Sequence, residues 1–207
     1  MKQLKEAFRE SGVSFDTLLL DYGDLTTSDP KRLAADLAFM RSWIDAASLC
    51  GAKQIRIVAG EAEPSDEDAL RRAAQHLNAL SEYARPKNVA VVTENFKALT
   101  STGESCRALM EQTGDEVRWI TDFGNFNGVR KYEELGTILP RSVSVHAKAH
   151  YDERGMPDRA EFEKCLDVVT NAGFDCAYVL IYDGPGDMWE GLERIRAIVD
   201  KRIREAI

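Results

Sequence analysis

The chain has 207 residues, of which 44% are hydrophobic and 30% are charged, and this length and composition predict one soluble domain spanning residues 1–207. Its net charge of −8 argues against a broad basic surface and therefore against nucleic acid as a partner. No apolar run is long enough to cross a membrane, no start reads as a signal peptide, and the four cysteines form no C-x-x-C pair, so we expect a reduced, cytoplasmic protein.

Short, apolar, β-branched segments alternate with longer helical segments along the whole chain. Their near-continuous hydrophobicity suits parallel strands that are covered on both faces. The predicted strands are residues 15–20, 54–58, 89–93, 117–121, 142–145 and 177–182.

Capping residues mark the helices that lie between these strands. One helix is expected at residues 2–10, and the next should begin at Asp29-Pro30 and end at Gly51. Four later helices are predicted from a cap residue that stands three positions before a carboxylate. The predicted N-caps are Ser65, Ser101, Asp158 and Asp187. Strands that alternate with helices in this way predict βαβ units, as found in a barrel or a doubly wound sheet.

Acidic or imidazole side chains follow five of the six predicted strands. They are Asp21, Glu94, Asp122, His146 and Asp183. The carboxyl ends of the strands in a parallel barrel meet on one face, where catalytic groups lie. A doubly wound sheet usually carries a glycine-rich first turn, and no G-x-G-x-x-G motif is present. We therefore predict an α/β fold of the (β/α) TIM-type barrel class, incomplete at the N-terminus because about six of eight strands are recognisable.

Four of these side chains together have the chemistry of a metal site. Three carboxylates and one imidazole suit Mn²⁺, Mg²⁺ or Co²⁺, and Zn²⁺ would be less favoured without thiolates or more histidines. The predicted ligands are Glu94, Asp122, His146 and Asp183. Each acid taken alone could instead be a helix cap or an ion-pair partner, His146 could be a core histidine, and Asp21 reads equally well as part of a turn.

Several short motifs resemble one known family. They are Thr-Glu-Asn-Phe at 93–96, Leu-Thr-Ser-Thr at 99–102, Thr-Asp-Phe-Gly-Asn-Phe at 121–126, Val-His-Ala-Lys at 145–148 and Tyr-Asp-Gly at 182–184. In this order they resemble the sugar phosphate isomerase/epimerase group of xylose isomerase-like TIM barrels. The resemblance implies the same four metal ligands. Two departures stand out, because the group usually has glutamate where this chain has Asp183 and often has histidine where it has Phe96.

The resemblance also implies a chemistry, which is isomerisation or epimerisation beside the carbonyl of a sugar or sugar phosphate, through an enediolate. The metal would polarise the carbonyl, Glu94 would remove the proton, and Asp183 would return it. The candidate substrate-binding residues are Lys148, Asn125, Arg56 and His150. Each has a structural alternative: a rim ion pair for Lys148, a turn for Asn125, a buried pair with a carboxylate for Arg56, and a loop position for His150.

Two other functions fit parts of the sequence. The departures at Asp183 and Phe96 allow a catalytically impaired barrel that binds a small polar ligand. A metal-dependent abasic-site endonuclease shares the barrel, but it would carry more than three histidines and a basic groove.

A barrel that is incomplete at the N-terminus would leave an open strand edge, which affects the expected oligomeric state. Exposed strand edges are normally covered or paired, so we expect a homodimer that covers the edge. The alternatives are that Met1 is not the natural start of the protein, or that the sheet closes with fewer strands.

Overall fold

The computed structural model describes residues 2–206. The chain forms two compact units, an N-terminal unit of Met1–Arg118 and a C-terminal unit of Trp119–Ile207. Each unit contains parallel strands that follow one another in chain order. The six strands in the described part of the chain each overlap a predicted strand, which confirms the predicted α/β architecture of alternating strands and helices.

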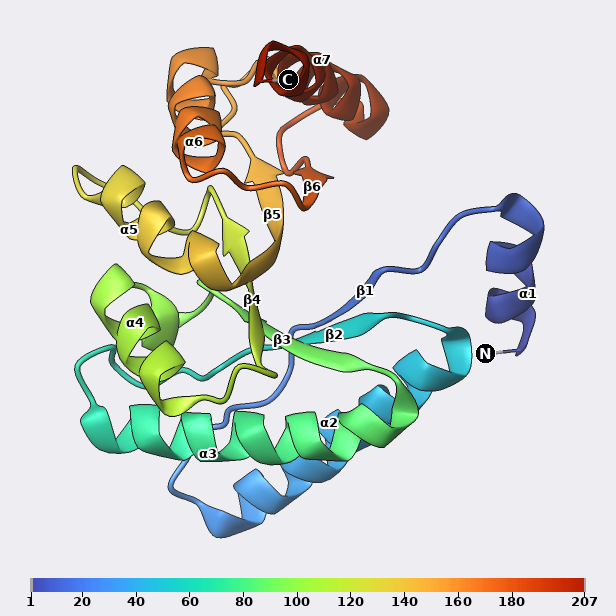
Figure 1. Cartoon of the computed structure of the whole chain (residues 1–207), viewed down its shortest axis with the longest axis vertical. Coiled ribbons are helices and arrows are strands. Elements are labelled where there is room, and N and C mark those ends of the chain that lie inside the picture. Colours follow the sequence, from blue (N-terminus) through green and yellow to red (C-terminus); the bar gives the residue numbers. More distant parts are fainter. Residues whose placement is uncertain (1, 207) are drawn as a thin grey trace. The chain divides into compact units, whose positions relative to one another are not determined.

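In the N-terminal unit, helices pack against three parallel strands. Strand β1 pairs with β2 and β2 pairs with β3 in parallel. Helices α2 and α3 pack side by side against these strands (Figure 1). The elements are α1 (Lys2–Ser11), β1 (Thr17–Leu20), α2 (Pro30–Cys50), β2 (Gln54–Ile57), α3 (Glu67–Ala84), η1 (Arg85–Lys87), β3 (Ala90–Glu94), η2 (Ala98–Thr100) and α4 (Gly103–Gln112).

The C-terminal unit repeats this plan. Strand β4 begins at the last residue of the N-terminal unit and pairs with β5, which pairs with β6. Helix α6 contacts α5 and α7, and α7 also contacts β6 (Figure 1). The elements are β4 (Arg118–Asp122), α5 (Lys131–Ile138), η3 (Leu139–Arg141), β5 (Ser142–Lys148), α6 (Arg159–Asn171), β6 (Ala177–Ile181) and α7 (Met188–Ala206).

The predicted capping residues are confirmed at helix ends where only one residue can act as the cap. The Asp29 carboxylate accepts hydrogen bonds from Lys31 N and Arg32 N at the start of α2, and Gly51 ends the helix with φ of +82°. This left-handed conformation costs glycine least among the residues. The predicted caps Asp158 and Asp187 are also confirmed, since each carboxylate accepts the backbone N–H three residues on.

Two predicted caps are wrong by one residue. Helix α3 is capped by Asp66, whose Oδ1 accepts from Ala69 N at 2.8 Å, and not by Ser65. Helix α4 is capped by Thr102, which accepts from Ser105 N, and not by Ser101. In both places two adjacent residues can cap, and the backbone conformation selects the second one.

Each unit buries its own apolar core. In the N-terminal unit, Ile55 and Ile57 of β2 are fully buried together with Leu77 of α3. In the C-terminal unit, the rings of Phe123 and Phe162 meet edge to face with centroids 6.0 Å apart. All four residues of β2 are buried, which explains the continuous hydrophobicity of this strand. Within residues 2–206, no helix combines the length and the apolar character needed to cross a membrane.

Candidate metal centre and active site

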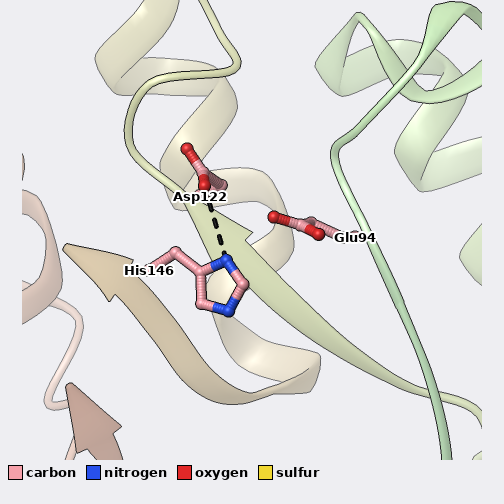
Figure 2. A group of neighbouring side chains, drawn as sticks. All are labelled: Glu94, Asp122 and His146. Atoms are coloured by element: carbon pink, nitrogen blue, oxygen red, sulfur yellow. Dashed lines mark ion pairs between the residues drawn. The ribbon is translucent and has the colours of Figure 1, made fainter. Parts of the chain in front are cut away.

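Asp122 and His146 form a buried polar pair on neighbouring strands. Asp122 is the last residue of β4 and lies in register with His146 of β5. Its Oδ2 is 3.4 Å from Nδ1 of His146 (Figure 2), and both side chains are about 5% exposed. The other oxygen, Oδ1, accepts a hydrogen bond of 2.6 Å from Gly124 N. The turn after β4 therefore fixes the orientation of the Asp122 carboxylate.

Glu94 is the last residue of β3, and its carboxylate is buried beside a guanidinium. Oε2 of Glu94 lies 3.1 Å from Nε of Arg56, and both side chains are 4% exposed. This contact is an ion pair without the alignment of a hydrogen bond. Arg56 Nη2 also donates to Asp21 Oδ1 at 2.5 Å, so Asp21, which follows β1 directly, contacts Arg56 from an exposed position.

The turn after Glu94 is held by Thr100. Its hydroxyl donates to the carbonyl of Glu94 at 2.9 Å and accepts from Phe96 N at 3.0 Å. The ring of Phe96 lies over the Arg56 guanidinium, with the central carbon 5.1 Å from the ring centroid. The next residue, Lys97, has φ of +72°, a conformation that costs a non-glycine residue energy and is common beside functional sites. The resembled group often has histidine at this position. In this chain the position holds Phe96, whose ring packs on Arg56.

The remaining predicted residues lie on the C-terminal unit. Lys148 is the last residue of β5, and its Nζ is 2.6 Å from Oδ2 of Asp183. Asp183 lies two residues beyond the end of β6. Asn125 is half-buried in the turn after β4, and the exposed His150 has Nε2 3.5 Å from Nζ of Lys131.

Sequence analysis did not single out two charged residues of the C-terminal unit, the buried Lys131 and the partly buried Glu161. Lys131, the first residue of α5, is 4% exposed and pairs with Glu161 in the first turn of α6. Glu161 Oε1 also accepts from the thiol of Cys165, and burial raises the pKa of that thiol. Glu161 was visible only as a capping residue, and no sequence signal distinguishes Lys131 from an ordinary surface lysine.

A small cleft opens beside Lys148 and Asp183. Its volume is about 250 Å³. Its walls come from the turn after β4, from the end of β5 and from the segment after β6. The lining residues are Gly124, Lys148, Ala149, His150, Tyr151, Asp183, Gly184 and Pro185. The Tyr151 hydroxyl donates to the carbonyl of Ile181 at 3.0 Å, which ties the segment after β5 to β6.

The phenol of Tyr151 gives a testable pH dependence. Burial, with smaller contributions from Asp183 and Tyr182, raises its pKa to about 12. Because the unfolded chain releases this proton near pH 10, the contribution of Tyr151 to stability is complete below pH 10 and is lost as the pH rises towards 12. We expect Tyr151→Phe to flatten the fall in the free energy of unfolding between about pH 10 and 12, measured by urea denaturation. The exposed Tyr22→Phe is the control, and an equal flattening there would contradict the assignment.

Comparison with known proteins shows the family. The model of the xylose isomerase-like TIM barrel family matches residues 1–198. The chain therefore belongs to the xylose isomerase-like TIM barrel family, and the resemblance inferred from its motifs is confirmed. No curated protein matches the sequence.

Solved structures of several sugar epimerases share the fold. An L-ribulose 3-epimerase has a TM-score of 0.77 with 15% identity, over 99% of this chain and 80% of the other. A D-tagatose 3-epimerase-like protein has a TM-score of 0.74 with 15% identity, over 99% and 82%. A xylose isomerase-like TIM barrel protein from Mycobacterium smegmatis, solved in complex with magnesium, has a TM-score of 0.72 with 16% identity, over 99% and 78%. These similarities confirm the predicted barrel class of the fold.

The residues fit a divalent metal ion. Glu94, Asp122 and His146 are all buried, and each offers one atom that could coordinate a metal (Figure 2). Two carboxylates and one imidazole suit hard or borderline divalent cations. Asp183, the fourth predicted ligand, is not part of this set, and its carboxylate is paired with Lys148.

Proposed function

We propose that the chain is a divalent-metal-dependent isomerase or epimerase of a sugar or sugar phosphate, in which both units act as one domain. The main support is the position of two carboxylates at the ends of consecutive strands: Glu94 ends β3 and Asp122 ends β4. Asp122 also pairs with His146. Groups at these strand ends belong to the catalytic face of a barrel. The epimerases among the structures that share the fold support the same reaction class.

Glu94, Asp122 and His146 would hold the metal, for which Mn²⁺, Mg²⁺ and Co²⁺ are the best candidates and Zn²⁺ is a further one. The magnesium in the Mycobacterium smegmatis structure supports a hard divalent cation. When bound, the ion would supply Lewis-acid polarisation of the substrate carbonyl. The turn that binds Asp122 Oδ1 and the contact of Asp122 with His146 keep two of these side chains oriented before the ion binds.

The proton transfers are assigned to two carboxylates. Glu94 would remove the proton beside the carbonyl, which gives an enediolate, and Asp183, after taking up a proton from solvent, would deliver that proton to the carbon; Glu94 would then release its proton to solvent. Arg56 orients Glu94 through the ion pair at 3.1 Å. Nη1 of Arg56 is buried and has no hydrogen-bond partner among the residues that the structure describes, so it can donate to a substrate oxygen. Lys148, His150 and Asn125 are proposed to contact further substrate hydroxyls.

Metal analysis and a product screen test this function. Purified protein should contain or bind a divalent metal, and with Mn²⁺ it should convert at least one ketose from a panel of free and phosphorylated sugars into an isomer. Protein stripped of metal is the control and should show no turnover. Binding of a metal without any turnover would favour the impaired, ligand-binding barrel. Cleavage of DNA at abasic sites would favour the endonuclease instead.

We propose that the protein acts in the cytoplasm. None of its four cysteines forms a disulfide in the described residues, and Cys50, Cys106 and Cys165 are packed in the interior. Reduced, buried thiols are typical of proteins from a reducing compartment.

We also propose that the protein is a homodimer. In the N-terminal unit, Tyr22, Phe39 and Trp43 form a chain of edge-to-face contacts while each ring is more than a third exposed. Strand β1 pairs only with β2 among the described strands, and its Leu19 is half exposed. Apolar rings beside a strand edge are typical of a surface that is covered by a partner. Light scattering should give twice the mass of the chain, and a stable monomer at micromolar concentration would exclude the dimer.

A further inference from the structure

We propose that Asp183 does not coordinate the metal, and that Lys148 holds its carboxylate on the substrate side, where the two side chains act together on hydroxyl groups of the sugar. This inference rests on the proposed function and refines it. It departs from the ligand set that the family resemblance implies, because in that set the acid after the last strand completes the metal site.

The environment of Asp183 differs from that of the other candidate ligands. The side chains of Glu94, Asp122 and His146 are at most 6% exposed, whereas that of Asp183 is 54% exposed. Asp183 lies in the segment beyond β6, while the other three residues belong to strands. Its side chain is also one methylene shorter than that of the glutamate usual in the family. A short, exposed carboxylate is poorly suited to complete a buried metal site.

The ammonium of Lys148 already engages one carboxylate oxygen of Asp183. Nζ lies 2.6 Å from Oδ2, which is the distance of a strong charge-assisted hydrogen bond. An ammonium at this distance disfavours a second cation beside the same oxygen, because the two positive charges repel each other. Coordination by Asp183 would therefore have to use Oδ1 or displace Lys148 from Oδ2.

The path of the Lys148 side chain is set by Gly124. A Cβ atom on Gly124 would lie 2.8 Å from Cδ and 3.1 Å from Cγ of Lys148, so the lysine arm runs directly over this glycine. The backbone N–H of the same glycine donates to Asp122 Oδ1. One turn thus orients a proposed metal ligand and also supports the arm that holds Asp183, which keeps the two carboxylates in separate roles.

The pair lines the small cleft of the C-terminal unit. A volume of about 250 Å³ lies below the roughly 300–1,000 Å³ of sites for drug-sized ligands, and it suits part of a small polyol. An ammonium donates hydrogen bonds and a carboxylate accepts them, whereas a sugar hydroxyl does both. Adjacent hydroxyl groups can therefore bind to Lys148 and Asp183 at the same time without breaking the pair.

Calorimetry with Mn²⁺ alone tests the inference. We expect Asp183→Asn and Lys148→Met to bind Mn²⁺ within about threefold of the parent, whereas Asp122→Asn should lose about 100-fold or more. The matched control is Asp45→Asn, which removes the acid of another half-exposed pair, with Lys87 at 2.9 Å. It should bind Mn²⁺ as the parent does.

The outcomes separate this inference from the proposed function. If the parent binds Mn²⁺ and Asp183→Asn loses affinity as Asp122→Asn does, Asp183 is a ligand and only the inference is wrong. If the parent binds no Mn²⁺, the proposed metal site itself is wrong, and the inference falls with it. Crystals soaked in Mn²⁺ give a second readout, because an Asp183 oxygen within about 2.5 Å of the ion would overturn the inference directly.

Discussion

Asp122→Asn is expected to weaken Mn²⁺ binding by about 100-fold or more and to abolish turnover, because it removes the charge of a ligand that also orients His146. The amide oxygen can still accept the hydrogen bond from Gly124 N, so the turn after β4 should persist. Calorimetry measures the affinity, and the urea midpoint should stay close to that of the parent.

Asp152→Asn is the matched control for this prediction. Asp152 is exposed, and like Asp122 its Oδ1 accepts backbone N–H groups, those of Arg154 and Met156. The same chemical change in that loop should leave Mn²⁺ affinity unchanged. Equal losses in both variants would point to a general effect of charge, and an unchanged affinity in Asp122→Asn would remove Asp122 from the metal site.

The elements of the fold could be predicted because the signals are local. Each predicted strand is a short apolar run, and single residues such as Asp29 and Gly51 set the ends of α2 without competition. Where two adjacent residues could cap, as Ser65 and Asp66 can, the sequence alone did not select the right one. Helix α5 was not predicted, because its N-cap residue Arg130 makes no side-chain capping bond and the sequence therefore carries no start signal there.

The candidate site residues could be predicted from their positions at the ends of strands, but the side chains with which they form ion pairs could not. Glu94 and Asp122 end their strands as expected, whereas β5 continues past His146 to Lys148. The pairing of Lys148 with Asp183 depends on how far β5 extends and on the path of a long side chain over Gly124. Such contacts arise from tertiary packing and leave no periodic signal in the sequence.

Arg56→Met is expected to lower the free energy of unfolding by about 3–5 kcal/mol, the cost of breaking a buried ion pair by removing one partner. Arg56 is 4% exposed and sits between Asp21 and Glu94, with the ring of Phe96 over its guanidinium. Methionine fills much of the same volume, so the loss should come from electrostatics more than from a cavity. Asp21 is exposed and can return to water, but the Glu94 carboxylate stays buried and loses its cationic neighbour.

A double-mutant cycle with Glu94→Gln isolates the pair. If the destabilisation comes from the buried Glu94 charge, the double variant should be more stable than the sum of the single effects predicts, by about 0.5–3 kcal/mol. Arg71→Met is the matched control, because Arg71 forms an exposed pair with Asp68 and should cost at most about 1 kcal/mol. Urea denaturation of the four proteins and the control gives every value needed. Additive effects in the cycle would show that Arg56 stabilises the N-terminal unit through Asp21 and Phe96. The destabilisation in Arg56→Met would then not come from the buried charge of Glu94.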